Sequence, residues 1–251
     1  MSIQRNKYTR VAAFFDLDGT LIPKPSLECR LFQELLRHRR IPLGNYLRWA
    51  AQALRLLPNG LLAVRHGNKV HLTGLNRDLI LCYAETVSFF EEAISRVLWH
   101  ASQGHEIVLL TGTLQELAQL AASALECELE IRDASVPVRI YATRLRTQAG
   151  QWTGYLDGEA LYGPAKAHLV EALGQFERID LQQSYGYGDD FEDHHFLHLV
   201  AHSNAVNPDS ELAAVANRNH WPIFRWNHRK TTLSERNLYC QSGIQTMENR
   251  V

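Results

Sequence analysis

The sequence predicts an α/β fold in which helices cover a doubly wound, Rossmann-like and mainly parallel sheet, with a helical insertion. Two observations carry this prediction. Short continuous apolar runs, typical of strands buried on both faces, recur along the chain and end in polar loops. Longer segments with apolar residues at helical spacing separate these runs, so strands and helices alternate.

The first half of the chain supplies a strand, the insertion and a helix–strand–helix unit. Residues 11–15 are a continuous apolar run that meets the polar sequence 16–20, as expected of a buried strand and the loop after it. Apolar residues recur at helical spacing over 26–66 and are interrupted by Pro42 and Pro58, which predicts a group of short helices. The expected elements that follow are a helix over 85–103, a strand over 106–110, a polar turn at 111–113 and a helix over 114–125.

The second half continues the alternation. Residues 140–145 and 152–156 flank a turn at 148–150, which predicts a hairpin. The remaining expected elements are a helix over 163–176, a strand near 183–186, an acidic loop at 188–193, a strand at 205–207, a helix from Asp209 and a strand at 222–224.

These elements suggest a core domain and a cap. We predict that residues 1–21 and 82–251 form the core, with 226–251 as a polar tail. Residues 22–81, the helical insertion, would form the cap.

The composition is that of a globular protein rather than a secreted or membrane-spanning one. Of 251 residues, 45% are hydrophobic and 21% are charged, and the formal net charge is −1. This charge gives no overall preference for nucleic acid. The polar N-terminus lacks the apolar core of a signal peptide, and no window reaches the roughly 18 apolar residues of a membrane span. The four cysteines have no C-x-x-C spacing, so we expect reduced thiols and a cytoplasmic protein.

Charge is nevertheless distributed unevenly. Residues 22–80 hold ten Lys or Arg against three acidic residues, a net charge of +7, so the rest of the chain carries −8. Solvated helix faces are one explanation. The other is a positive surface that attracts an anionic substrate or an anionic lipid headgroup, and both stay open.

Residues with reactive side chains follow the predicted strands. Ligands of open α/β sheets bind beyond the carboxyl ends of the strands, so residues at these ends are expected to meet. The candidates are Asp16 and Asp18 after the first strand, Thr111 and Gly112 after the second, Lys166 near the start of a helix, and Asp189 and Asp193 in the acidic loop.

This set of groups suits phosphoryl transfer. The reaction needs a nucleophile, a proton donor for the leaving oxygen, a hard cation and fixed donors for the phosphate oxygens. A carboxylate is ionised near neutral pH and attacks phosphorus without prior deprotonation. Mg²⁺ prefers oxygen ligands, and lysine supplies a point charge.

Four segments in chain order resemble the four motifs of the haloacid dehalogenase (HAD) superfamily. They are Asp16-Leu17-Asp18-Gly19-Thr20, Leu110-Thr111-Gly112-Thr113, Gly163-Pro164-Ala165-Lys166 and Gly188-Asp189-Asp190-Phe191-Glu192-Asp193. Residues 152–158 and 205–209 extend the resemblance to subfamily IB, the phosphoserine phosphatase-like group, over roughly residues 10–226.

The resemblance implies a role for each motif residue. Asp16 would be the nucleophile, and Asp18 would protonate the leaving group and then activate water. The Asp16 carboxylate, the Asp18 main-chain carbonyl and the Asp189 carboxylate would bind Mg²⁺. Thr111 and the Gly112 amide would hold phosphate oxygens, Lys166 would stabilise the developing charge, and Asp193 would support the metal waters or Lys166.

Each role has a structural alternative. Asp16 and Asp18 would otherwise be turn or capping acids, Thr111 a helix N-cap, and Lys166 a solvated lysine. Asp190 competes with Asp189 as the metal ligand, and we favour Asp189 because of its spacing to Asp193. His194, His195, His198 and His202 have spacings that suit a metal, but we favour surface or supporting histidines.

The substrate is less determined than the reaction. Relatives that act on phosphoserine carry a glutamate nine residues after the nucleophile, where this chain has Pro25, and Glu28 comes three residues later. Glu28, Arg48 and Arg55 are the candidate substrate contacts in the basic cap. We expect a small phosphorylated metabolite or a phospholipid-related headgroup. Residues 46–57 would pack within the cap or, as the less favoured alternative, lie on a membrane surface.

The same kinds of residues also occur in proteins with functions other than a phosphatase. A phosphorylation-dependent signalling receiver uses similar groups but is about half this length and lacks the insertion. An inactive binding module is disfavoured because no catalytic position is missing. A phosphotransferase or mutase of the same superfamily stays open.

Overall fold

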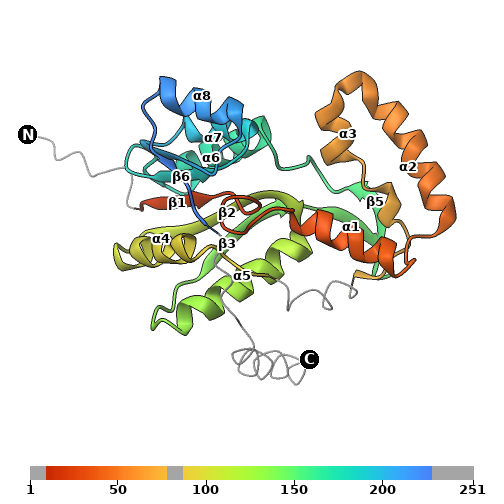
Figure 1. Ribbon diagram of the computed structural model, residues 1–251, viewed down its shortest axis with the longest axis horizontal. Coiled ribbons are helices and arrows are strands. Elements are labelled where there is room, and N and C mark those ends of the chain that lie inside the picture. Colours follow the sequence, from red (N-terminus) through yellow and green to blue (C-terminus); the bar gives the residue numbers. More distant parts are fainter. Residues whose placement is uncertain (1–9, 78–86, 228–251) are drawn as a thin grey trace, which may run out of the picture.

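The computed structural model describes residues 10–77 and 87–227. Its centre is a six-stranded sheet with the order β3-β2-β1-β6-β7-β8 (Figure 1), in which every pairing is parallel. The strands are β1 (Ala12–Phe15), β2 (Glu106–Leu114), β3 (Val138–Thr143), β6 (Tyr185–Gly188), β7 (His202–Val206) and β8 (Ile223–Phe224). The chain builds outward from β1 on one side and then returns to build on the other. The predicted doubly wound α/β sheet is therefore confirmed.

The register of β1 determines where the site lies. Phe15 pairs with Leu109 of β2 and with Tyr187 of β6. The residues that follow these three positions therefore emerge together at the carboxyl edge of the sheet, at the point where the strand order reverses.

Alternating residues of the central strand serve two cores, one on each face of the sheet. Ala13 and Phe15 belong to a core with helices α4 (Glu91–Ser102) and α5 (Gln115–Glu130). Ala12 and Phe14 face the opposite core. That second core is closed by α6 (Pro164–Phe176), α7 (His194–Leu197) and α8 (Ser210–Arg218). Burial on both faces explains why the strand is continuously apolar.

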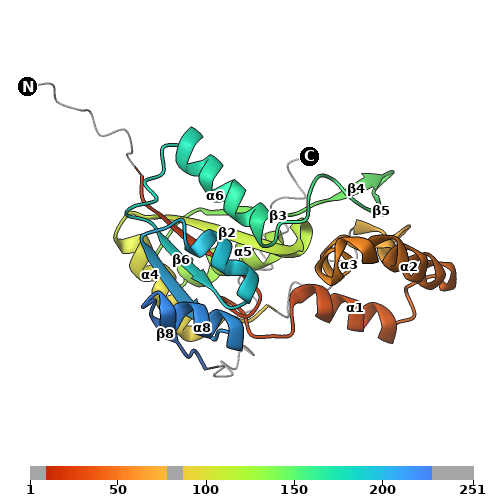
Figure 2. The same ribbon diagram turned by 90° about the horizontal axis from the view of Figure 1, so that it is seen from above.

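The insertion is mainly helical, as predicted, over the residues 22–77 that the structure describes. Its elements are α1 (Leu27–Arg37), α2 (Leu43–Leu56), η1 (Leu57–Asn59), α3 (Leu61–Gly67) and η2 (Val70–Leu72). Ser26 caps α1 by accepting a hydrogen bond from the Cys29 amide. Figures 1 and 2 show α1, α2 and α3 together at one end of the molecule, beside the sheet. The division of the chain into cap and core domains stays a prediction.

A small antiparallel hairpin connects the sheet to the insertion. It consists of β4 (Leu145–Gln148) and β5 (Gln151–Leu156). The Gly74 amide donates to the Trp152 carbonyl at 2.8 Å, and the Trp152 amide donates to the Leu75 carbonyl at 3.0 Å. At Gly154, which has a φ of +80°, a Cβ atom would lie 2.5 Å from Thr73 Oγ1, so only glycine fits this close approach.

Several expectations need correction. The predicted hairpin strand 140–145 is divided at Arg144, because residues up to Thr143 extend the main sheet and only the following residues pair in the hairpin. The second strand does not end at 110 but continues to Leu114. Cys127 is disulfide-bonded, so the expectation of reduced thiols throughout is wrong, although Cys29 is free. The predicted tail beyond residue 227 lies outside the described residues.

No helix within residues 10–77 and 87–227 is long and apolar enough to cross a membrane.

Candidate active site

The centre of the site is an ammonium group held between two carboxylates. Lys166 Nζ donates to Asp16 Oδ1 and to Asp193 Oδ1, both at 2.6 Å. All three side chains are buried. Asp16 directly follows β1, Lys166 lies in the first turn of α6 and Asp193 ends the short helix η4 (Phe191–Asp193). The structure thus brings three predicted residues into direct contact and excludes the solvated alternative for Lys166.

Asp189 is the second buried carboxylate beside Asp16. Its Oδ2 atom lies 2.6 Å from Lys24 Nζ, and Thr20 Oγ1 donates to its Oδ1 atom at 3.3 Å. Gly19 is required here, because a Cβ atom at this position would lie 2.2 Å from Asp189 Oδ2. The loop after β1 therefore closes tightly over Asp189.

Asp190, the alternative metal ligand, caps a helix instead. Its side chain accepts a hydrogen bond from the Glu192 amide at 3.2 Å and caps η4. Asp193 Oδ2 in turn accepts from the Asp189 and Asp190 amides at 3.1 and 3.4 Å. This geometry favours Asp189 over Asp190 as the acid that faces Asp16.

Asp18 is held away from the lysine by two donors. The Leu27 amide donates to its Oδ1 atom at 2.8 Å, and the Thr113 hydroxyl donates to its Oδ2 atom. The carboxylate therefore connects the start of α1 to the end of β2. The sequence predicted a role for Asp18 but none for Thr113.

An irregularity in β2 explains the position of Thr113. The pairing with β3 shifts between Thr111 and Leu114, so a bulge forms where a polar turn was predicted. Thr111 is buried, and its Oγ1 atom accepts from the Thr113 amide at 3.1 Å. The N-cap of α5 is Leu114, so the alternative of Thr111 as the cap is excluded.

Gly112 lies under a residue of the insertion. A Cβ atom on Gly112 would come within 3.7 Å of His66 Nδ1, and the His66 ring stacks on Tyr162 with centroids 4.2 Å apart. Burial, followed by the charges of Lys69 and Arg65, lowers the pKa of His66 to about 4. A neutral imidazole from α3 thus lies beside Gly112, whose amide is the predicted phosphate donor.

The candidate substrate residues fall into two groups. Glu28 forms a salt bridge with Lys69, whose side chain is buried. Burial, and to a smaller extent the charge of Glu28, raise the pKa of Asp18. Glu28 is therefore near the site and paired with Lys69 through Oε2, whereas its Oε1 atom is buried without a hydrogen-bond partner among the described residues. Arg48 and Arg55 are exposed on α2, at the end of the molecule away from the sheet (Figure 2).

The His194 ring lies 4.0 Å from the His195 ring and 5.9 Å from the His198 ring, but among the described residues no group of possible metal ligands includes these histidines. His194 and His198 donate through Nδ1 to the carbonyls of Phe191 and His194, respectively. His195 Nε2 lies 3.9 Å from Glu192, and His202 stacks on Tyr185. These contacts favour the supporting roles over a metal site.

Burial and charge crowding shift the titration of the buried groups. Burial raises the pKa of Asp16 above its ordinary value against the opposing charge of Lys166, and raises that of Asp193 to about 6. Burial, and then the charges of Asp16 and Asp193, raise the pKa of Asp189 well above its usual range. Burial disfavours the Lys166 ammonium, but the two adjacent carboxylates outweigh it and raise the pKa of Lys166.

These carboxylates fit a hard divalent cation. One oxygen each from Asp16, Asp189 and Asp193 lies within 4.8 Å of the others, and all three residues are buried. A cation would offset the burial and the mutual repulsion that together keep the pKa of Asp189 high. Oxygen donors of this kind suit Mg²⁺.

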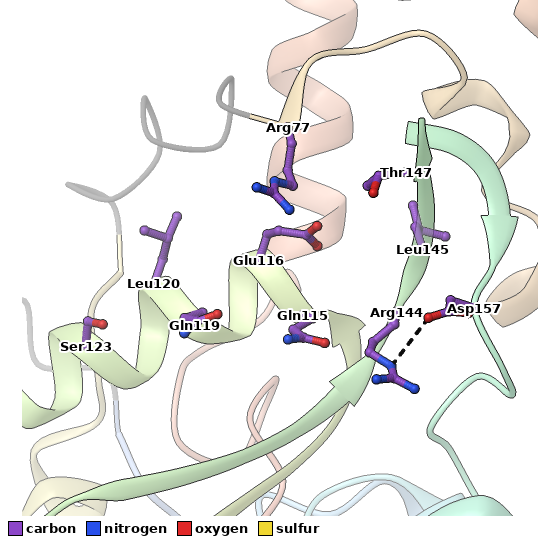
Figure 3. Close-up of a pocket in the computed structure, with 10 residues that line it drawn as sticks. All are labelled: Arg77, Gln115, Glu116, Gln119, Leu120, Ser123, Arg144, Leu145, Thr147 and Asp157. Carbon is purple, nitrogen blue, oxygen red and sulfur yellow. Dashed lines mark ion pairs between the residues drawn. The ribbon is translucent and has the colours of Figure 1, made fainter. Parts of the chain in front are cut away.

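A separate cavity of about 440 Å³ lies between α5 and the hairpin (Figure 3). Arg144 and Asp157 approach to 4.0 Å in its wall. None of the ten residues that line it belongs to the carboxylate cluster. The cavity is therefore not the site described above.

Comparisons with known proteins agree with this geometry. Residues 13–198 match the family of haloacid dehalogenase-like hydrolases. A probable phosphatase of Mycobacterium tuberculosis (strain ATCC 25618 / H37Rv) is 27% identical over 242 residues, covering 90% of this chain and 79% of the relative. A phosphoserine phosphatase of the same strain is 28% identical over 228 residues, covering 84% and 70%, respectively.

Two solved structures show the same fold. A Bordetella pertussis Tohama I protein of unknown function has a TM-score of 0.67 at 22% identity, covering 86% of this chain and 99% of that one. A phospho-aspartyl intermediate analogue of phosphoserine phosphatase has a TM-score of 0.56 at 15% identity, covering 89% and 97%.

Proposed function

The chain belongs to the haloacid dehalogenase-like hydrolase family, and from this premise we propose that it hydrolyses a phosphoric monoester through an aspartyl-phosphate on Asp16, with Mg²⁺ as cofactor. Its relatives include proteins named phosphatase and phosphoserine phosphatase. The observation that carries the proposal is the placement of Asp16, buried after the central strand and 2.6 Å from Lys166 Nζ. A phosphotransferase or mutase would use the same first step, and no feature of the site favours it.

Asp16 acts as the nucleophile. One carboxylate oxygen attacks phosphorus, a bond forms between them, and the bond from phosphorus to the leaving oxygen breaks. Lys166 keeps Asp16 oriented and offsets the charge on the phosphoryl oxygens, which Thr111 and the Gly112 amide also bind. Asp193 positions Lys166 through the second hydrogen bond of the ammonium.

Asp18 moves the protons. It gives a proton to the departing oxygen, then takes one from the water that attacks the aspartyl-phosphate and releases inorganic phosphate. Burial raises the pKa of Asp18, although the hydrogen bond from Thr113 opposes the rise. A raised carboxyl pKa suits a group that must both donate and accept a proton near neutral pH.

The metal ligands would be the carboxylates of Asp16 and Asp189 and the main-chain carbonyl of Asp18. When bound, the cation supplies positive charge that neutralises the phosphate and lowers the barrier to attack by an anion. Lys24, which pairs with Asp189, then has to give up or share this carboxylate.

The substrate that we propose carries no ammonium group beside its phosphate. Glu28 is the acid of the insertion that lies near Asp18, and Lys69 already neutralises it. A small phosphorylated metabolite, or a phospholipid-related headgroup, with a neutral or anionic remainder fits this environment better than phosphoserine.

The test is a hydrolysis assay of the purified chain against a panel of phosphomonoesters, with Mg²⁺ or with excess chelator. We expect activity only with Mg²⁺, and inhibition by Ca²⁺, which accepts more ligands and lets Asp16 bind through both oxygens. Full activity in chelator would exclude the metal assignment.

Variants of the two motif aspartates test the intermediate. Asp16→Asn should lower the rate by on the order of 10⁴-fold, because the attacking anion is lost. Asp18→Asn should still release an aryl alcohol in a burst and accumulate phosphoenzyme, because an activated leaving group needs little protonation. The exposed Asp157 supplies the control, since Asp157→Asn should behave as wild type. Phosphoenzyme that maps to a residue other than Asp16 would overturn the assignment.

The sequence-based prediction of a cytoplasmic location becomes part of this proposal. The disulfide at Cys127 argues against this location, because reducing compartments disfavour disulfides. Fractionation of cells that express the chain is the direct test.

A further inference from the structure

The outer surface of α2 carries an apolar stripe that faces solvent. Leu43, Leu47, Ala50 and Leu54 follow one another at intervals of four, three and four residues, which places them along one side of the helix. Leu43, Leu47 and Leu54 are 86%, 77% and 72% exposed. We call these four residues the outer stripe.

The outer stripe is not the face by which α2 packs. The buried residue of α2 is Asn45, whose side-chain amide donates to the carbonyls of His71 and Thr73. Trp49 also packs on Phe32 and His71. The helix therefore has one side that packs on the insertion and another, apolar side that is exposed. The expectation that residues 46–57 pack within the cap holds only for the first side.

The exposed apolar surface continues past the end of α2. Leu57 is 50% exposed, and Leu61, at the start of α3, is 76% exposed. In Figure 2, α2 lies at the end of the molecule away from the sheet, and α3 lies nearer to the sheet. An apolar surface of this kind on a soluble fold marks an interaction site.

The charge around the outer stripe identifies what it meets. Arg48 and Arg55 each follow a stripe leucine and are seven residues apart, so they share one flank of the stripe. Both are exposed. From residue 35 to residue 77 there are eight Lys or Arg and no Asp or Glu. The surface around the stripe is thus basic and lacks acidic residues to neutralise it.

We propose that the outer stripe and its arginine flank dock on the surface of an anionic lipid bilayer, with the leucines in the headgroup–acyl boundary and the arginines on lipid phosphates. An exposed leucine face beside basic residues is the pattern of a helix that lies in a membrane interface. A second copy of this chain is disfavoured as the occupant, because pairing would bring two basic surfaces together. The proposal does not depend on the proposed catalysis.

The experiment is flotation of the full chain with vesicles of phosphatidylcholine alone or with added phosphatidylglycerol. We expect binding to the anionic vesicles that weakens at high salt, and little binding to the neutral ones. The variant Leu47→Gln/Leu54→Gln should lower binding by on the order of tenfold, because it removes the apolar anchors. Phe176→Gln is the matched control, since Phe176 is 82% exposed on α6, outside the stripe.

A second variant tests the charge. Arg48→Gln/Arg55→Gln should weaken binding to anionic vesicles by about fivefold for each arginine removed. Arg218→Gln, an exposed arginine of α8, should leave binding unchanged. Unchanged melting temperatures would show that each variant is folded.

Three outcomes would overturn the proposal. The first is no binding to anionic vesicles. The second is a wild type that is dimeric in sedimentation and becomes monomeric in Leu47→Gln/Leu54→Gln, which would make the stripe a self-association interface. The third is vesicle binding unaffected by either variant, with a raised KM of Arg48→Gln/Arg55→Gln for a soluble substrate, which would assign the arginines to substrate capture.

Discussion

Asp16 and Asp18 have different partners, and the partner limits what each carboxylate can do. Asp16 shares Lys166 with Asp193, which keeps a buried anion oriented toward the carboxyl edge of the sheet. Asp18 instead accepts from a backbone amide and a hydroxyl, and its pKa is raised. Two aspartates two residues apart are thereby suited to nucleophilic attack and to proton transfer.

The contrast between the two adjacent acids gives a testable pair. Asp189→Asn should raise the Mg²⁺ concentration for half-maximal activity by tenfold or more, on the order of 1.4 kcal/mol, because a buried anionic ligand is lost. Asp190→Asn should leave that concentration unchanged, because asparagine also caps a helix start. Titration of activity with Mg²⁺ measures both. The reverse result would make Asp190 the ligand.

Thr113 is the residue that the sequence did not single out. Removal of its hydroxyl in Thr113→Val takes away a donor that holds Asp18, so we expect about tenfold slower turnover of alkyl phosphates. Aryl phosphates, which need little protonation, should be affected less. Thr113→Ser keeps the hydroxyl and should restore activity. Equal losses in the two variants would show a packing effect instead.

At the scale of elements, the sequence predicted the strands that form the site because their signals are local. A continuous apolar run before Asp16, and glycine and proline before Lys166, mark a strand end and a helix start without reference to the rest of the chain. Parallel pairing then brings these ends to one edge. The fold class and the residues around Lys166 were therefore predictable.

Other features depend on contacts between distant elements. The bulge at Thr111–Leu114 arises from pairing with β3, and the approach of His66 to Gly112 depends on how α3 sits over the sheet. The apolar spacing of α2 predicted a helix, but that pattern does not reveal which apolar side faces the protein. No local sequence pattern around Lys24 predicts its contact with Asp189.

Asn45 connects α2 to the segment that meets the hairpin. It is buried, and its amide donates to the His71 and Thr73 carbonyls at 3.2 and 2.8 Å. Asn45→Ala should lower the free energy of unfolding by about 2 kcal/mol, because two partly buried carbonyls lose their donor. Urea unfolding measures the change. The exposed Asn217→Ala on α8 is the control and should be nearly neutral. A neutral Asn45→Ala would mean that water satisfies these carbonyls.

For the whole molecule, stability depends on joining two cores across one sheet. His100 of α4 is fully buried against the sheet, on the face that carries α4 and α5, where it contacts Phe15 and Tyr187. Its Nε2 atom lies 2.9 Å from the Tyr187 hydroxyl, and its Nδ1 atom lies 2.9 Å from His105 Nδ1. Burial, followed by the charges of His105 and Arg96, lowers the pKa of His100 to about 3. The folded protein therefore holds this imidazole neutral well below the ordinary pKa of a histidine.

This burial predicts a loss of stability in mild acid. Below the ordinary pKa of 6.5 the unfolded chain binds a proton at His100 that the folded chain does not bind until about pH 3. Stability from this group is thus complete above pH 6.5 and falls by about 1.4 kcal/mol per pH unit below it.

The variant His100→Gln, which removes the titrating group, tests this loss. We expect His100→Gln to be less stable than wild type, and this difference in the free energy of unfolding should shrink by about 2 kcal/mol between about pH 7.5 and pH 5. Urea unfolding at the two pH values measures it. Buried histidines that do not contact His100, such as His66, titrate equally in both proteins and cancel. A deficit that is the same at both pH values would show that His100 binds its proton equally in the folded and unfolded states.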